Sequence, residues 1–380
     1  MKRIIAGLVL VALAATPALG TPVVAIEDDL VFHLTDPAQI DARTDLIAST
    51  GVKYTRLGLD WNHVAPRRPA NPDDPSDPAY DWSRYDRMIT NFRARNIGTM
   101  ITLNGTPPWA STSGKWNASP RIADGAAFAG AVARRYNGKY PAPGGGSLPA
   151  IKTISVRNEP NIYLFTTPQC RRVGNRWVPA SPKFYAALLK ASQPKIRSAN
   201  PDVRIVAGET GSTKDESGGC KNAITTLGTF EFTRLLHKEL GGGRNMPFDM
   251  WAQHLYPVGP PDRAAFFPSW RNLSGLTKLL NKMHPANRMP LIVSETGYTT
   301  SYSPYHRYFA SEAQQAAWVD LTYKVASKNT QVELVVWFNM QDHRNWPAGL
   351  FRADLSKKPS FSRFRALAIA TPLTAKWALP

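Results

Sequence analysis

The chain has 380 residues, of which 43% are hydrophobic and 19% are charged, a composition typical of a globular protein with a substantial core. Its length suits one α/β barrel with insertions, since such barrels run from about 200 to more than 400 residues. The formal net charge of +18 could favour an anionic glycan, an anionic cell-wall polymer or a membrane surface, or it could reflect a solvated basic surface. No basic run carries interleaved aromatic residues, so nucleic-acid binding is disfavoured.

The first twenty residues have the pattern of a secretory signal peptide. Lys2 and Arg3 precede an apolar stretch over 4–15, and Ala18-Leu19-Gly20 is a small-x-small cleavage signal. A membrane anchor is the alternative, but the apolar stretch is short and Pro17 interrupts it. We therefore expect a signal peptide over 1–20, one domain over 21–380, and a secreted, extracellular protein. No later segment is apolar for long enough to span a bilayer.

The chain contains two cysteines, Cys170 and Cys220. A secreted protein meets an oxidising compartment, so we expect a disulfide between them. The alternatives are two free thiols or half of a metal site. The metal site is the weaker alternative, because no His or Cys lies at ligand spacing beside either cysteine.

Strand-like apolar runs alternate with helix-like segments along the rest of the chain. The runs lie at 23–34 (a strand and its exit), 52–61, 98–103, 151–156, 203–207, 248–255, 291–294 and 332–338. Segments with helical patterns lie at 40–49, 82–95, 123–136, 181–192, 230–240, 276–283 and 312–327. This order predicts a single (β/α)8 barrel rather than an open doubly wound sheet. No Gly-rich phosphate loop follows the first strand, so a dinucleotide-binding fold has little support.

Arg56 lies in the middle of the strand predicted at 52–61. Period-two alternation places Tyr54, Arg56 and Gly58 on one face of that strand. A charge in this position is costly unless it is paired. We interpret Arg56 as an arginine inside the barrel that holds a catalytic carboxylate; a purely structural ion pair is the alternative.

Tryptophans follow the third strand, where the chain leaves the barrel. Trp109 and Trp116 are candidates for stacking on sugar faces, because the C–H surface of a pyranose packs against an aromatic ring. Either ring could instead pack a loop.

Two glutamates follow apolar strands. The run Ile154 to Val156 leads to Asn158-Glu159-Pro160, and Leu291 to Ser294 leads to Glu295. Such a pair suits acid/base and nucleophilic work on a glycosidic bond, because one carboxyl must hold a proton while the other stays charged.

Two further glutamates compete for these roles. Glu209-Thr210-Gly211 repeats the Glu-Thr-Gly that begins at Glu295, and it also ends a strand. Strand counting puts Glu209 on the fifth strand, where it could line the cleft without attacking, so Glu295 is preferred as nucleophile. Glu333, early on the last strand, is expected to be structural.

The run Val156-Arg157-Asn158-Glu159-Pro160-Asn161 resembles the retaining glycoside hydrolases of the barrel clan that contains family 5 cellulases and family 39 β-xylosidases. The resemblance implies that Glu159 is the acid/base and Glu295 the nucleophile. It also implies that Asn158 binds the sugar 2-hydroxyl. The chain departs from the clan pattern at Arg157, where family 39 usually has Trp.

The resemblance extends to supporting residues. Arg56 resembles the arginine that holds the nucleophile, and His254-Leu255-Tyr256 resembles the His-x-Tyr of the sixth strand. His254 is then expected to bond Glu159 or the sugar, and Tyr256 to bond Glu295. Trp337 resembles the tryptophan of the eighth strand that forms the floor beneath the reacting sugar. The resemblance requires no metal or organic cofactor.

The same residues are compatible with other functions. The same barrel could be a non-catalytic glycan-binding or cell-wall protein, and a transglycosylase would share every residue named. We expect a monomer that acts on an oligo- or polysaccharide, which could be anionic. The sugar, the linkage and the choice between endo and exo action are not specified by the residues.

Overall fold

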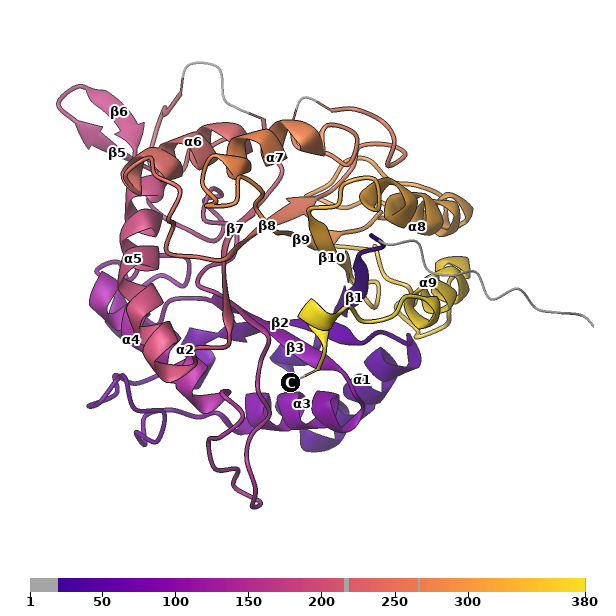
Figure 1. The fold of residues 1–380 in the computed structure, drawn as a ribbon, viewed down its shortest axis with the longest axis horizontal. Helices are drawn as coiled ribbons and strands as arrows, with labels where there is room; N and C mark the ends of the chain where they lie inside the picture. Colours follow the sequence, from indigo (N-terminus) through magenta and orange to yellow (C-terminus); the bar gives the residue numbers. More distant parts are fainter. Residues whose placement is uncertain (1–19, 215–218, 266, 380) are drawn as a thin grey trace, which may run out of the picture.

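The computed structural model describes residues 20–214, 219–265 and 267–379. Within these residues, parallel strands close into a barrel in the order β1-β10-β9-β8-β7-β4-β3-β2, and the helices surround it (Figure 1). This confirms the predicted (β/α)8 barrel. Residues 1–19 of the predicted signal peptide lie outside the described residues. Among the helices described, none is long and apolar enough to cross a membrane.

The barrel strands match the predicted runs closely. They are β1 (Val23–Glu27), β2 (Tyr54–Asp60), β3 (Gly98–Asn104), β4 (Thr153–Ser155), β7 (Arg204–Thr210), β8 (Met250–Leu255), β9 (Leu291–Thr296) and β10 (Val332–Phe338). A separate antiparallel hairpin, β5 (Cys170–Val173) and β6 (Arg176–Pro179), leaves the loop after β4.

Helices follow most of the strands and cover the outside of the barrel. They are α1 (Pro37–Ser49), α2 (Trp61–Val64), α3 (Ser83–Ala94), α4 (Ile122–Arg135), α5 (Ser181–Ala199), α6 (Thr229–Glu239), α7 (Leu273–Asn281), α8 (Glu312–Ala326) and α9 (Pro359–Ala370). Short 3-10 turns lie at η1 (Val31–His33), η2 (Pro108–Ala110) and η3 (Ala375–Trp377).

Local sequence signals account for several helix ends. Asp36 caps α1 by accepting a hydrogen bond from Gln39 N at 2.9 Å. Ser311 and Gln314 form a capping box at α8. In contrast, α5 continues through Pro194 to Ala199, beyond the segment predicted at 181–192. Packing of its buried face, including Ile196, outweighs the hydrogen bond that Pro194 cannot donate.

Two apolar layers hold the barrel together. One lies between the strands and the helices, and the other fills the lower half of the barrel interior, where Tyr54, Met250 and Leu334 meet. Trp377 of η3 closes this lower end, edge-on to Tyr54 at 5.1 Å between ring centroids. Glu333 accepts a hydrogen bond from Trp377 Nε1 at 3.2 Å, so it has the structural position expected of it.

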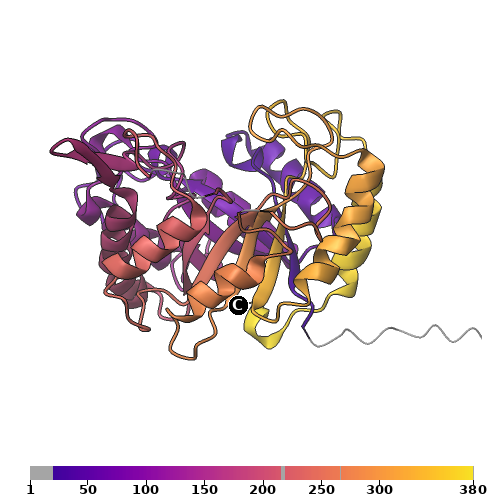
Figure 2. The ribbon, with the colours of Figure 1, turned by 90° about the horizontal axis from the view of Figure 1, so that it is seen from above.

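The opposite end of the barrel carries the loops that follow the strands. Figure 2 shows the β5–β6 hairpin projecting at this end and the C-terminal segment at the other. The predicted disulfide is present: Cys170 and Cys220 are bonded with their Cα atoms 6.0 Å apart. It joins the loops after β4 and β7, so it braces the rim around the carboxyl ends of the strands.

Candidate active site

Arg56 is the hub of a buried polar cluster in the upper barrel. Its guanidinium donates to Glu295 at 2.8 Å, to Glu209 at 2.9 Å and to Asn158 Oδ1 at 2.7 Å, and it also bonds Glu27. The side chain is 4% exposed. Because Arg56 lies directly above Tyr54 in the two-residue repeat of β2, the strand alternation placed it inside the barrel, as predicted.

Glu159 is held at the exit of β4 by an unusual backbone conformation. Its φ of 36° lies in the left-handed region that non-glycine residues seldom adopt, and Glu209 opposite has a φ of 46°. Glu159 N donates to Glu209 O at 3.1 Å. Gly211 allows the close approach: a Cβ at that position would lie 2.7 Å from Glu159 Oε1. Two strand exits therefore fix the direction of one carboxyl group.

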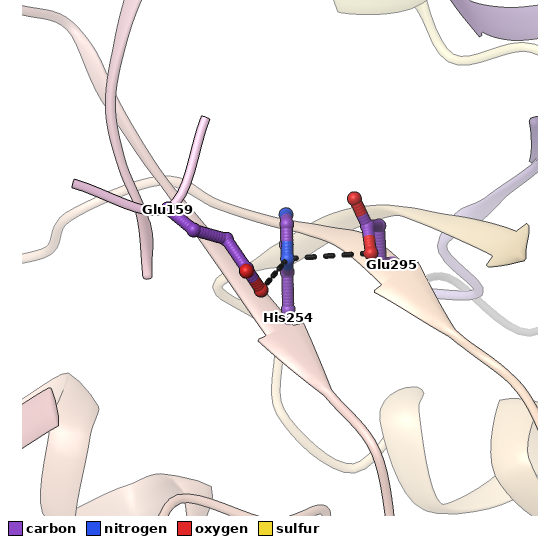
Figure 3. A group of neighbouring side chains, drawn as sticks. All are labelled: Glu159, His254 and Glu295. Atoms are coloured by element: carbon purple, nitrogen blue, oxygen red, sulfur yellow. Dashed lines mark hydrogen bonds and ion pairs between the residues drawn. The ribbon is translucent and has the colours of Figure 1, made fainter. Parts of the chain in front are cut away.

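His254 connects the two predicted catalytic glutamates. Its Nδ1 lies 2.8 Å from Glu159 Oε1 and 3.3 Å from Glu295 Oε2 (Figure 3). A neutral imidazole with its proton on Nδ1 donates toward both carboxyl groups. Two residues further along, on the same face, Tyr256 donates its hydroxyl to Glu295 Oε2 at 2.5 Å. The predicted pairing of Tyr256 with Glu295 and of His254 with Glu159 is present.

The two carboxyl groups are close enough to act on one bond. One carboxylate oxygen of Glu159, one of Glu295 and a ring nitrogen of His254 all lie within 4.8 Å of one another. The side chains of Glu159 and Glu295 are 13% and 11% exposed, so both are largely withdrawn from water yet reachable from the cleft.

The surroundings of these groups give them different proton affinities. Burial raises the pKa of Glu159 to about 8, and Arg56 opposes this rise only in part. Burial also raises the pKa of Glu295, but His254, Arg56 and the hydrogen bond from Tyr256 all oppose it. Burial lowers the pKa of His254, which keeps the ring neutral at neutral pH. Glu295 has more groups that stabilise its charged form, so the proton is held by Glu159.

A cleft of about 280 Å³ opens above this cluster. Glu159, Glu295, Arg56 and Asn158 line it together with the aromatic rings of Trp116, Phe165 and Phe338. The amide oxygen of Asn158 is engaged by Arg56, which leaves its NH₂ group to donate into the cleft.

Two of the predicted aromatic residues lie elsewhere. The side chain of Trp337 points away from the barrel interior and is fully buried in the layer between the strands and the helices. Its Nε1 donates to Ala348 O at 3.3 Å, so Trp337 does not form the floor of the cleft. Alternation along β10 turns Leu334, Val336 and Phe338 inward, and Phe338 lines the cleft in its place. The resemblance assigned the floor of the cleft to Trp337, but the side chain that points inward is that of the next residue, Phe338.

Trp109 also packs away from the cleft. Its Nε1 donates to Ala65 O at 2.8 Å, and its ring lies edge-on to Trp61 at 5.4 Å. Trp116, the other tryptophan considered, is 37% exposed and does line the cleft. Trp109 therefore packs a loop, whereas the ring of Trp116 is available to stack on a sugar.

The sequence reasoning missed several buried residues near the cleft, among them Glu27, Asp60 and Arg157. Glu27 ends β1 with an inward side chain that lines the cleft and bonds Arg56. It ends an apolar strand as Glu159 and Glu295 do, so the same rule would have found it. Arg157 is 3% exposed and donates to Thr106 Oγ1 at 3.0 Å, to Ala118 O at 3.2 Å and to Thr166 Oγ1 at 3.2 Å.

Arg157 joins the two loops that carry the cleft wall, since Thr106 and Ala118 follow β3 whereas Thr166 follows β4. Burial lowers the pKa of Arg157 to about 10. Nothing in the sequence distinguished this role, because the partners are backbone carbonyl and hydroxyl groups of a distant loop.

Glu209 is placed differently from Glu295. Its oxygens accept hydrogen bonds from Arg56 at 2.9 Å and from Thr102 Oγ1 at 2.9 Å, and it is not among the described residues that line the cleft. The geometry makes it a support for Arg56.

Glu159, His254 and Glu295 also form a possible set of metal ligands, because their donor atoms lie within 4.8 Å of one another. One nitrogen and two carboxylate oxygens suit a divalent ion such as zinc. These donors already bond one another, and Tyr256 and Arg56 occupy both oxygens of Glu295. A cation could bind here only by breaking those contacts.

Comparison with known proteins gives two kinds of similarity. No family model matches the chain. A rice (Oryza sativa subsp. japonica) protein named beta-glucosidase-like SFR2, chloroplastic, is 32% identical over 78 residues, which are 20% of this chain and 12% of that protein. The Arabidopsis thaliana galactolipid galactosyltransferase SFR2, chloroplastic, is 30% identical over 92 residues, which are 24% of this chain and 14% of that protein. The matches thus cover only a small part of the plant proteins.

Solved structures resemble the whole barrel. A family 39 glycoside hydrolase from Bacteroides cellulosilyticus WH2 superposes with a TM-score of 0.60 at 19% identity, over 92% of this chain and 64% of the other. A monomeric β-xylosidase from Caulobacter crescentus CB15 gives a TM-score of 0.57 at 17% identity, over 91% and 67%. At these identities the likeness establishes the fold, a (β/α)8 barrel of the kind that the sequence pattern predicted.

Proposed function

We propose that this protein is a retaining β-glycoside hydrolase that cleaves an oligo- or polysaccharide by double displacement. The observation that carries the proposal is the spacing of Glu159 and Glu295, since one carboxyl oxygen of each lies within 4.8 Å of the other. In retaining enzymes the two carboxyl groups are about 5–5.5 Å apart, whereas inverting enzymes need roughly 6.5–9.5 Å to admit a water molecule.

In the first step Glu295 attacks the anomeric carbon while Glu159 protonates the leaving oxygen. A carboxyl with a pKa of about 8 carries its proton at neutral pH, as an acid must. Arg56 and Tyr256 direct the oxygens of Glu295 and stabilise its charge. Asn158 donates to the sugar 2-hydroxyl, a bond that strengthens in an oxocarbenium-like transition state.

In the second step Glu159 acts as a base and removes a proton from the water that attacks the glycosyl-enzyme. Once Glu295 is esterified it no longer carries a negative charge, so the pKa of Glu159 falls. Glu159 is then a carboxylate that can accept the proton of the attacking water. His254 stays within reach of both groups through Nδ1 and orients them.

Secretion is part of the proposal. The signal-like segment at 1–20 supports it, and so does the disulfide between Cys170 and Cys220, because such bonds persist in oxidising compartments. Detection of the protein in the culture medium with a new N-terminus near residue 21 is the expected result; retention in the cytoplasm would contradict it.

Transfer to a sugar hydroxyl instead of water is the second candidate, because the Arabidopsis relative carries the name of a galactosyltransferase. The same residues would perform it. Product analysis with an added sugar acceptor separates the two: free sugar indicates hydrolysis, and a longer glycoside indicates transfer.

The test of the chemistry is azide rescue on a panel of aryl β-glycosides. We expect an active wild type, a dead Glu295→Ala variant, and a Glu159→Ala variant that azide reactivates to give a β-glycosyl azide. An α-glycosyl azide formed by Glu159→Ala would indicate inversion. Full activity of Glu295→Ala would remove that residue from the mechanism, and an inactive wild type on every glycoside would favour a glycan-binding protein.

A further inference from the structure

The cleft has the opposite charge to the protein as a whole. The protein has a formal net charge of +18, yet five carboxyl groups line the cleft: Glu27, Asp29, Asp60, Glu159 and Glu295. With protons on Glu27 and Glu159, the remaining three acidic side chains still outnumber the one guanidinium of the lining. Arg56 is the single Lys or Arg side chain among the described residues of the lining. Its guanidinium is already shared by three glutamates and Asn158, so it has little positive charge to offer a ligand.

Asp60, at the end of β2, is one of the carboxyl groups of this lining that make no ion pair with Arg56. Its Oδ1 accepts from Asn62 N at 3.0 Å and its Oδ2 accepts from Trp116 Nε1 at 2.9 Å. His63 Nδ1 lies 3.8 Å from Oδ2. Each carboxylate oxygen has two acceptor positions, so both oxygens of Asp60 keep capacity for a ligand.

Trp116 brings an aromatic face to the same place. Its ring is 37% exposed, and the centroid lies 6.0 Å from that of Phe165. Gly105 makes the contact between Trp116 and Asp60 possible, because a Cβ there would lie 2.5 Å from Trp116 Nε1 and 2.4 Å from Asp60 Oδ1. An exposed ring beside a carboxylate provides a stacking surface for a sugar and acceptors for its hydroxyl groups.

We propose that Asp60 and Trp116 form a sugar-binding subsite of the cleft that accepts uncharged or amino-bearing sugars and rejects uronic acids. This deepens and rests on the proposed glycosidase function, since it names the charge class of the substrate. A uronate carboxylate would lie against Asp60 in a cleft whose one guanidinium is already occupied, whereas an ammonium group would meet an opposite charge. The positive charge elsewhere on the protein does not reach into this lining.

Three oligosaccharides of one backbone test the proposal. Cello-oligosaccharides are uncharged, chitosan oligomers carry an ammonium at C2, and cellouronate oligomers carry a carboxylate at C6; all are β-1,4-linked. Binding is measured by calorimetry at one salt concentration in a Glu159→Gln background, so that no ligand is consumed. Hydrolysis of the same oligomers by the wild type is followed in parallel.

We expect cellouronate to bind at least about tenfold more weakly than the cello-oligosaccharide, and chitosan at least as tightly as it. The ratio of the Kd for cellouronate to the Kd for the cello-oligosaccharide should fall about fivefold or more in Asp60→Asn. Asp202→Asn is the matched control, because it removes the same charge from an exposed position before β7, at the other end of the barrel. Trp116→Ala should weaken all three ligands alike, since it removes the stacking surface.

The proposal is overturned if cellouronate binds as tightly as the uncharged oligomer, or if Asp60→Asn leaves this ratio of Kd values unchanged. An equal effect of Asp202→Asn would also overturn it, because bulk charge would then explain the selectivity. Binding of none of the oligomers would remove the subsite. Selective binding without any hydrolysis by the wild type would leave the subsite standing and defeat the proposed catalytic function instead.

Discussion

Glu27 and Glu295 accept hydrogen bonds from the same nitrogen atom, Nη1 of Arg56. Glu209 bonds the other side of the guanidinium, so three buried glutamates share one positive charge. The cluster would carry excess negative charge if all three were ionised. Burial raises the pKa of Glu27 well above its usual range, so we expect Glu27 to be the group that takes up a proton and leaves the guanidinium to Glu209 and Glu295.

Glu27→Gln therefore has a small expected effect. Glutamine has the shape and the neutral charge of a protonated glutamate, so kcat at pH 7 should stay within about threefold of the wild type. Glu27→Ala should lower kcat more, because it leaves a cavity beside Arg56 and releases Nη1 from one of its two partners. The measurement is kcat for the three proteins on one aryl glycoside. A large loss of kcat in Glu27→Gln would show that Glu27 acts as an anion.

The pH profile should follow the carboxyl groups of Glu159 and Glu295, the two proposed catalytic residues. Activity is expected to fall above about pH 8, where Glu159 loses its proton, and to fall in acid as Glu295 gains one. The measurement is kcat/KM from pH 4 to 10. Replacement of Glu159 by Gln, assayed with a glycoside whose leaving group needs no protonation, should abolish the alkaline limb. An alkaline limb that persists in this variant would assign it to another group.

The raised pKa of Glu159 also predicts a stability effect. The folded state holds a proton that the unfolded chain releases, so the stability of the wild type should fall as the pH rises from the ordinary value of 4.5 to about 8. One such proton contributes at most about 1.4 kcal/mol per pH unit. Glu159→Gln lacks this term, so its melting temperature should rise relative to the wild type between pH 5 and pH 8. A constant difference across this window would contradict the assignment.

Gly211→Ala should displace Glu159, the proposed acid/base, without touching the substrate. The new Cβ would lie 2.7 Å from Glu159 Oε1 and 2.3 Å from Ile162 Cδ1, so the carboxyl group must move. Loss of alignment by about 1 Å can cost about a hundredfold in rate. Gly144→Ala is the control, because a Cβ there meets no atom within 4 Å. We expect kcat to fall only in Gly211→Ala; equal rates for the two variants would show that Glu159 tolerates the shift.

Zinc should inhibit rather than activate. The donor atoms of Glu159, His254 and Glu295 lie close enough to bind a divalent ion, but an ion there would occupy both of the proposed catalytic carboxyl groups. We expect EDTA to leave activity unchanged and zinc to inhibit in competition with substrate, with the inhibition weakened in His254→Gln. Loss of activity on chelation that zinc restores would show that a metal takes part in the reaction.

Local patterns in the sequence predicted the fold and many residues of the candidate site. Strand alternation put Arg56 inside the barrel and His254 and Tyr256 on one face, because the pleat fixes side-chain direction within a strand. The glutamates at the ends of apolar strands were identifiable for the same reason, since the carboxyl ends of barrel strands meet at one face. The disulfide followed from the presence of two cysteines in a chain expected to be secreted.

Contacts across the barrel were decided only by the tertiary structure. The sharing of Arg56 by Glu27, Glu209 and Glu295 depends on the closure and stagger of distant strands, which no local pattern records. The place of Trp337 depended on a single residue of register, and a shift of one exchanges the interior for the exterior. The sign of the charge in the cleft was also hidden, because net charge counts every residue equally whereas a ligand meets only those that the fold turns toward it.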